Sequence, residues 1–129
     1  MPYVATLTSS DLEFGKQVTE QLKAASFPFR GTFWLYDEAA DDWTLMIATD
    51  LIEKVGRKET YLQLGETIRS VRQTAAFQSL RISVISPTDP LYSALRGVFA
   101  TTASVEGARL GHTVVDGVFV PDAYLYEIR

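Results

Sequence analysis

The chain of 129 residues contains no cysteine and only one histidine, His112. The absence of cysteine excludes disulfides, thiolate nucleophiles and zinc sites built on thiolates. Every catalytic triad and every multi-histidine metal centre either depends on His112 or is excluded. We expect His112, which follows Gly111 at the entrance to the last strands, to be a structural or surface residue. The alternative is a general base that works with an acid from elsewhere in the chain.

Long apolar runs and nucleotide-binding glycine patterns are also missing. No apolar run approaches the roughly 20 residues of a membrane-spanning helix, and the first ten residues, MPYVATLTSS, lack the basic and apolar regions of a signal peptide. None of the eight glycines follows the spacing of a dinucleotide-binding or phosphate-binding loop. We therefore expect a cytoplasmic protein that binds no membrane and carries no cofactor.

Positive charge is scarce as well. The chain has 12 Lys and Arg against 16 Asp and Glu, which gives a formal net charge of −4 and a pI near 4.9. Binding to nucleic acid depends mainly on neutralising phosphates with basic side chains, so we do not expect DNA or RNA as a partner. An acidic surface is suited to a basic protein partner, although a modest negative charge also serves solubility.

What the sequence does contain is typical of a folded globular protein. Hydrophobic residues make up 47% of the chain, charged residues 22% and aromatic residues 12%. A chain of this length buries roughly two thirds of the surface that its unfolded form exposes. We expect residues 1–129 to form a single globular domain with one core.

Three segments have the hydrophobic period of an amphipathic helix. The first covers about residues 10–25, where Ser10 and Glu13 have the spacing of a capping box. The second begins near Arg57 and continues for more than four turns. The third follows the residues SPTDP, in which Asp89 is the expected N-cap and the next proline the first helical residue.

Aromatic and β-branched residues predict strands at 30–36, 43–49 and 80–86. The first two are joined by an acidic loop, as in a hairpin, and we expect both to be largely covered on two faces because nearly all their residues are apolar. In the tail, an Asp-Gly pair at residues 116–117 lies between β-branched runs. This pattern predicts a second hairpin. Residues 101–111 are small and polar and predict a loop.

The expected order of elements is α-β-β-α-β-α-β-β, which indicates an α+β fold with a mixed or mainly antiparallel sheet covered by helices. A right-handed crossover through the second helix would make the strands at 43–49 and 80–86 parallel. The sequence shows no internal repeat, linker or low-complexity tract.

Two stretches of the chain, FWLYDEAADDWTLMIATDLIEKVG and ISVISPTDPLYSALRG, together resemble a family of short, uncharacterised bacterial proteins, a domain of unknown function. In that family an FWLY strand, a W-x-L-x-IAT strand and an S-P-x-D-P-L segment recur in this order. The resemblance covers the chain from about Phe27 to Tyr126. It implies a bacterial origin and supplies neither an activity nor catalytic residues.

The loop between the first two strands is rich in acids. Its carboxylates are Asp37, Glu38, Asp41 and Asp42. An EF-hand beginning at Asp37 would need an acid at position three, a glycine at position six and a glutamate at position twelve, and the sequence has Ala39, Asp42 and Ala48 there. Four like charges at a hairpin tip are also poorly suited to raise one pKa for general acid catalysis. The pattern favours a solvated tip and leaves a weak, irregular metal site open.

The polar stretch SPTDPLYSALR has a structural and a functional interpretation. Pro87 ends a strand, and Asp89 with Pro90 begins a helix, so local structure accounts for these residues. Alternatively, the helix N-terminus presents free amides to a small anionic ligand, with Arg96 nearby and His112 completing the pocket.

Aromatic residues on the first hairpin also have two interpretations. Trp34, Tyr36 and Trp43 are either core residues or an exposed patch that binds a partner, and Tyr124 and Tyr126 of the tail could join such a patch. Three helices can cover both sheet faces only if they pack efficiently, which favours some exposure and with it self-association.

Our first expectation is a non-enzymatic cytoplasmic interaction or regulatory domain that uses an aromatic sheet face or edge and self-associates. One version of it is an inhibitor-like or immunity-like protein. The alternative is a small enzyme or ligand-binding protein with an anion-accepting pocket near Asp89, Arg96 and His112.

Overall fold

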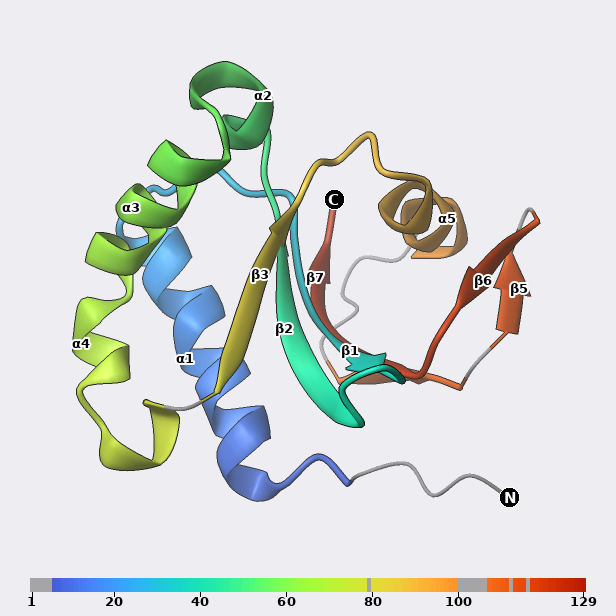
Figure 1. Cartoon of the computed structure of the whole chain (residues 1–129), viewed down its shortest axis with the longest axis horizontal. Coiled ribbons are helices and arrows are strands. Elements are labelled where there is room, and N and C mark those ends of the chain that lie inside the picture. The colour runs from blue at the N-terminus through green and yellow to red at the C-terminus, as the bar shows by residue number, and fades with distance from the viewer. Residues whose placement is uncertain (1–5, 79, 100–106, 112, 116) are drawn as a thin grey trace.

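A computed structural model of the chain describes residues 6–78, 80–99, 107–111, 113–115 and 117–129. The fold is α+β, as predicted, and consists of three layers with a sheet in the middle (Figure 1). The helices of the described residues are α1 (Ser9–Ala24), α2 (Leu51–Val55), α3 (Arg57–Thr67), α4 (Arg69–Arg72) and α5 (Pro90–Phe99), with a short 3₁₀ turn η1 (Ala75–Phe77). None of these helices is both long and apolar enough to cross a bilayer.

The central sheet has five strands in the order β3-β2-β1-β7-β4. Their bounds are β1 (Gly31–Asp37), β2 (Asp42–Ala48), β3 (Arg81–Ile85), β4 (Ala108–Leu110) and β7 (Ala123–Ile128). All neighbouring pairs are antiparallel except β2 and β3, which are parallel, so the predicted crossover is confirmed. The strands β5 (Thr113–Val115) and β6 (Val118–Val120) form a separate hairpin, which confirms the hairpin predicted from the Asp-Gly pair.

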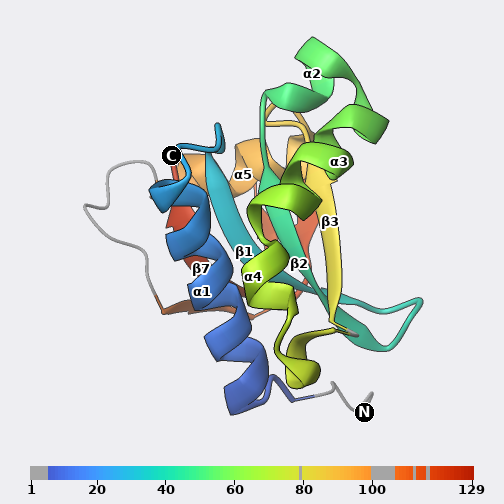
Figure 2. The ribbon, with the colours of Figure 1, turned by 90° about the vertical axis from the view of Figure 1, so that its left-hand side faces the viewer.

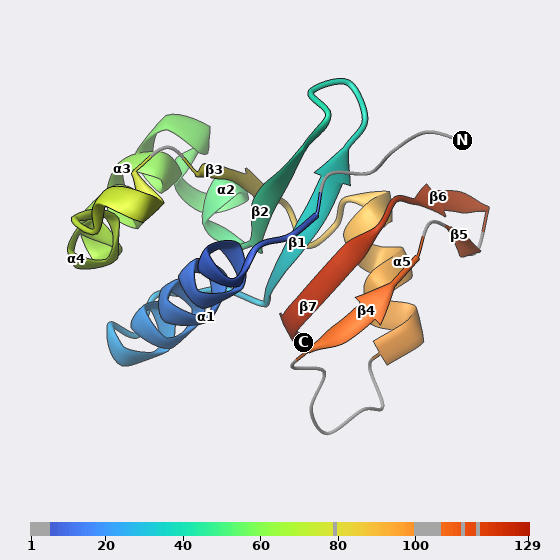
Figure 3. The ribbon, with the colours of Figure 1, turned by 90° about the horizontal axis from the view of Figure 1, so that it is seen from below.

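Successive side chains of β1 and β2 alternate between the two faces of the sheet. One face, here called the helix face, carries Trp34 and Leu45 and packs against α1, α3 and α4. The other, here called the groove face, carries Phe33 and Met46 and packs against α5 and the β5–β6 hairpin. Figure 3 shows these two groups of elements on opposite sides of the sheet. The prediction that both strands are largely covered on two faces is confirmed over most of their length, although Leu35 and Met46 are only partly buried.

On the helix face, α1 buries the residues predicted from its period, Phe14, Val18 and Leu22 (Figure 2). Its capping box differs from the predicted one, because Thr8 accepts from the backbone N–H of Asp11 and the Asp11 carboxylate accepts from the N–H of Thr8. The helix therefore begins two residues earlier than the Ser10 cap implied.

The long helix predicted from Arg57 is wrong in its extent, because the chain breaks at Ile68 into α3 and α4. The Thr67 hydroxyl donates to the carbonyl of Gln63 (2.8 Å), a bond that bends helices. The Arg72 guanidinium then donates to the carbonyls of three residues downstream, Phe77, Gln78 and Leu80. These bonds turn the chain back toward β3, so a continuous helix cannot form.

Two further elements were not predicted. The short helix α2 precedes α3, from which it is separated by Gly56 in the left-handed region (φ 85°). The strand β4 lies in the segment expected to be a loop, where Ala108 to Leu110 pair with β7. After the β5–β6 hairpin, the chain returns to the central sheet as β7, which pairs with β1.

On the groove face, α5 begins as predicted, with the Asp89 carboxylate accepting from the N–H of Leu91 (2.9 Å). Tyr92 of this helix is fully buried. Its hydroxyl lies 2.9 Å from the carbonyl oxygens of both Arg30 and Arg129 and accepts from the N–H of Arg129 (3.2 Å). Through these hydrogen bonds, Tyr92 links α5 to the start of β1 and the end of β7.

Candidate functional site

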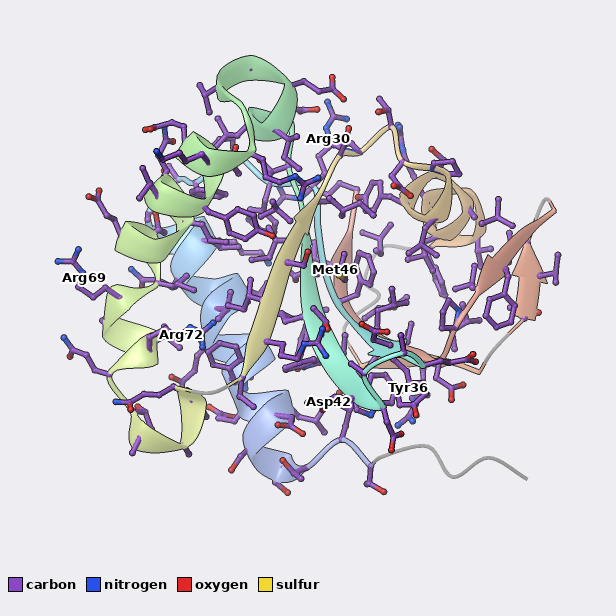
Figure 4. All side chains as sticks on the ribbon, in the orientation of Figure 1. Arg30, Tyr36, Asp42, Met46, Arg69 and Arg72 are labelled. Atoms are coloured by element: carbon purple, nitrogen blue, oxygen red, sulfur yellow. The ribbon has the colours of Figure 1, made fainter. Side chains whose placement is uncertain are left out.

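A groove with a volume of about 420 Å³ lies on the groove face, at the end of the sheet near the β1–β2 turn. We call it the sheet groove. Its floor comes from β1, β2 and β3, one wall from the β1–β2 turn and the other wall from β6 and the residue after it. The residues that matter below are Leu35, Thr44, Met46, Arg81, Ser83 and Phe119. Figure 4 labels Met46 midway along β2, and Tyr36 and Asp42 near the turn.

The strand register explains why these side chains meet. Thr44 of β2 is aligned with Leu35 of β1 and with Arg81 of β3. Met46 is aligned with Ser83 of β3 one pleat further along. Aligned residues of neighbouring strands point to the same face, so two rows of side chains form the floor.

The hydroxyl of Thr44 is the unusual feature of this floor. Thr44 is only 8% exposed, and its Oγ1 has no hydrogen-bond partner among the described residues. The other buried side-chain oxygen without a hydrogen bond, Oε2 of Glu127, lies 2.8 Å from the Lys23 ammonium and is compensated by that charge. An unsatisfied buried hydroxyl costs about 1–3 kcal/mol, so its presence at a groove needs an explanation.

The turn wall of the sheet groove is acidic. Asp37 and Glu38 line this wall, and Arg81 of β3 is the basic residue among the described lining residues of the groove. The Arg81 guanidinium lies 3.3 Å from the Asp37 carboxylate, and both side chains are substantially exposed. A pair of this kind contributes little to stability because water and salt screen it. The wall therefore carries an excess of negative charge.

The acids of the turn have local structural roles. Oδ1 of Asp37 accepts from the backbone N–H groups of Ala39 and Ala40, and Oδ1 of Asp42 accepts from the N–H of Trp43. The turn residues from 38 to 42 are exposed, so the prediction of a solvated hairpin tip is confirmed. Within the described residues, no three His, Asp or Glu side chains are grouped as a metal site would require.

Tyr36 is tied to the same turn, because its hydroxyl donates to the carboxylate of Asp41. This hydrogen bond to a carboxylate is the main cause that raises the pKa of Tyr36 to about 12, and burial and the nearby acids add to it. The turn is thus held to β1 by a phenol that stays protonated at neutral pH.

Of the two interpretations of Trp34, Tyr36 and Trp43, the core is confirmed and the exposed patch is wrong, because these side chains are only 1%, 8% and 3% exposed. They point to the helix face, where α1 and the following helices cover them. The indole N–H of Trp34 donates to the hydroxyl of Tyr126 (3.1 Å), which is also buried. In the described residues these aromatics are therefore core rather than surface.

Exposed apolar side chains lie on several elements, and two of them face each other on the β5–β6 hairpin. Val114 and Phe119 are aligned across the two strands, and they are 65% and 51% exposed. Phe119 also lines the sheet groove. The exposed face of the hairpin and the groove are consequently continuous.

Of the three residues of the alternative, anion-binding site, the structure describes Asp89 and Arg96. Asp89 is engaged as the cap of α5, and Arg96 lies exposed about 10 Å further along the same helix axis. Neither residue lines the sheet groove. His112 lies outside the described residues.

Side chains bond to the backbone groups at the outer edge of β3. The Tyr61 hydroxyl accepts from the N–H of Val84 (3.0 Å), and the Arg57 guanidinium donates to the carbonyl of Val84 (3.2 Å). Burial raises the pKa of Tyr61, but hydrogen bonds from Ser83 and Val84 and the nearby Arg57 leave that pKa below its ordinary value. Because these groups occupy the strand edge, β3 is not free to accept an added strand at Val84.

Sequence reasoning missed the floor of the groove. Thr44 and Met46 were counted among the covered residues of their strand, although the strict alternation with Trp43, Leu45 and Ile47 places them on the opposite face. That alternation was the available signal. No sequence signal showed that α5 would leave this end of the face uncovered.

A comparison of the chain with protein-family models, with curated proteins and with solved structures found no match. The resemblance to a bacterial family of unknown function therefore stays a prediction.

Proposed function

We propose that this protein is a non-enzymatic interaction domain of the bacterial cytoplasm, and that it holds a segment of a protein partner in the sheet groove. The observation that carries this proposal is a groove whose floor combines apolar side chains with an unsatisfied buried hydroxyl, and whose wall contains a half-exposed phenylalanine.

The size and composition of the groove support this use. A volume of about 420 Å³ falls within the range of roughly 300–1,000 Å³ that is usual for ligand sites. Such sites combine apolar side chains with a few polar groups that fix orientation, and here Leu35 and Met46 supply the former and Thr44 and Ser83 the latter. The groove opens to solvent beside the exposed hairpin, which suits a chain segment better than an enclosed small molecule.

The chemistry at the groove supports binding rather than catalysis. The groove lining includes two alcohols, Thr44 and Ser83, and Oγ of Ser83 shares a 3.3 Å hydrogen bond with the Tyr61 hydroxyl. That hydroxyl already accepts the N–H of Val84 as part of the closed β3 edge. Among the described residues, no hydrogen bond joins either alcohol to a carboxylate or an imidazole that would activate a nucleophile.

Peptide binding with matched surface variants tests the proposal. An array of synthetic peptides of about ten residues, varied in charge and apolar content, is probed with the purified chain, and the best binder is measured by fluorescence anisotropy. Phe119→Ser is expected to weaken this binding by about tenfold, because it removes an apolar contact worth about 1.4 kcal/mol. Leu62→Ser, at an exposed residue of α3 on the other side of the sheet, is expected to leave it unchanged.

Two results would contradict the proposal. One is an array with no binder above background. The other is an equal loss in the Phe119 and Leu62 variants. Self-association through the same surface is a competing use, and light scattering of the wild type and Phe119→Ser separates it from peptide binding, because only a dimer would show a mass that falls in the variant.

A further inference from the structure

We infer that the occupant of the sheet groove is a basic segment, in which a lysine or arginine stands next to apolar side chains. This inference rests on the proposed function and names the chemical class of its partner.

Charge is the first reason. Of the described lining residues, Asp37 and Glu38 are acidic and Arg81 is basic, and Arg81 already faces the Asp37 carboxylate. Asp41 and Asp42 add negative charge in the same turn. An acidic occupant would meet this wall with like charge, whereas a cation would be attracted to it.

Hydrogen-bonding capacity at Asp37 is the second reason. Its Oδ1 accepts two backbone N–H groups of the turn, and its Oδ2 faces the Arg81 guanidinium. Two carboxylate oxygens offer about four acceptor positions, so an ammonium or guanidinium group can be added without breaking the turn. The site can accept a cation while the hairpin keeps its shape.

The apolar floor suits the stem of the same side chain. Leu35 and Met46 are partly buried, and Met is an adaptable residue at surfaces that receive a partner. Lysine and arginine lay their methylene groups along such surfaces while the charged end stays near water or a carboxylate. Phe119 on the opposite wall adds an aromatic ring toward a bound cation.

Thr44 supplies an independent observation that a polar group of the occupant enters the groove. Its side chain is more than nine-tenths buried, it lines the groove, and its hydroxyl has no partner among the described residues. The hydroxyl itself is buried from solvent, so an occupant reaches it only if the side chain rotates about its Cα–Cβ bond. After that rotation it can accept an N–H of the occupant, either from the backbone or from the charged end.

Three peptides of about ten residues test the inference. They are identical, with apolar neighbours around a central position that is Lys, Gln or Glu, and their binding is measured by fluorescence anisotropy at low and high salt. The expected order of affinity is Lys, then Gln, then Glu, with about tenfold between Lys and Glu that shrinks at high salt.

The variant Asp37→Asn with Glu38→Gln is expected to abolish this order by weakening the Lys peptide to the level of the Gln peptide. Asparagine keeps an oxygen for the N–H of Ala39, so the turn is retained. The matched control is Glu59→Gln with Glu66→Gln on α3, which changes the net charge equally on the other side of the sheet and is expected to preserve the order. Thr44→Val is expected to weaken all three peptides by about threefold.

The outcomes separate the two proposals. Equal binding of the three peptides, or tightest binding of the Glu peptide, with a loss in Phe119→Ser, overturns the basic partner and leaves the groove as the binding site. Loss of the order in the α3 control as well also overturns it, because the preference would then come from net charge alone. Failure of every peptide to bind at about 1 mM, together with an array that has no binder, overturns both.

Discussion

The two faces of the central sheet are built from the same strands and differ in how completely they are satisfied. On the helix face, the buried indole of Trp34 has a hydrogen-bond partner in Tyr126, and buried Thr32 shares a 2.7 Å hydrogen bond with Thr19 of α1. On the groove face, Thr44 is buried without a partner among the described residues. Both faces contain buried polar groups with partners, including Tyr92 on the groove face, but the groove face also keeps an unsatisfied buried hydroxyl beneath a groove.

The largest expected effect is on the free energy of unfolding, which one substitution on each face compares. Trp34→Ala should lower the free energy of unfolding by about 3–5 kcal/mol, because it leaves a cavity and an unpaired Tyr126 hydroxyl. Met46→Ala on the groove face should cost about 1 kcal/mol, since its side chain is only partly buried. Urea denaturation followed by circular dichroism measures both. Equal losses would show that the faces are packed alike.

A pair of threonine substitutions sharpens the comparison because opposite signs are expected. Thr44→Val should raise the free energy of unfolding by about 1 kcal/mol, since it removes an unsatisfied hydroxyl and keeps the shape of the side chain. Thr32→Val should lower it by about 1 kcal/mol, because its hydroxyl is bonded to that of Thr19. The same denaturation experiment serves for both. A destabilised Thr44 variant would mean that its hydroxyl is satisfied in solution, and the groove would lose its main polar feature.

The last comparison concerns the turn between β1 and β2. The pKa of Tyr36 is raised from its ordinary 10.0 to about 12 in the folded protein, so its contribution to stability is complete below pH 10 and is lost as pH rises from about 10 to about 12. Denaturation midpoints at about pH 9 and about pH 11.5 should therefore fall more in the wild type than in Tyr36→Phe. An equal fall in the two proteins would place the pH dependence in other groups.

Elements that depend on neighbouring residues were predictable from the sequence. The Asp89 cap of α5, the period of α1 and the Asp-Gly hairpin are encoded within a few residues, and the structure contains all three. The parallel pairing of β2 and β3 followed from the crossover between them. These features require no knowledge of the rest of the chain.

Features that depend on distant residues were not predictable. The helix from Arg57 breaks at Ile68, and after α4 the chain is held by bonds from Arg72 to carbonyls that lead into β3. The strand β4 forms by pairing with β7. The burial of Trp34 depends on α1 lying across the helix face, which hydrophobic periodicity alone does not place. The groove was missed for the same reason, since its walls come from segments more than 70 residues apart, at Asp37 and Phe119.

The pairing of β1 with β7 has a consequence for how the molecule folds. Gly31 is paired with Ile128, so the strand at the centre of the sheet cannot complete its hydrogen bonds until the last strand has arrived. Contacts between residues this far apart in sequence form late and make folding slow. Phe119 reaches the groove with that same final segment. A partner that recognises the groove would thus bind only chains in which β7 has already paired with β1.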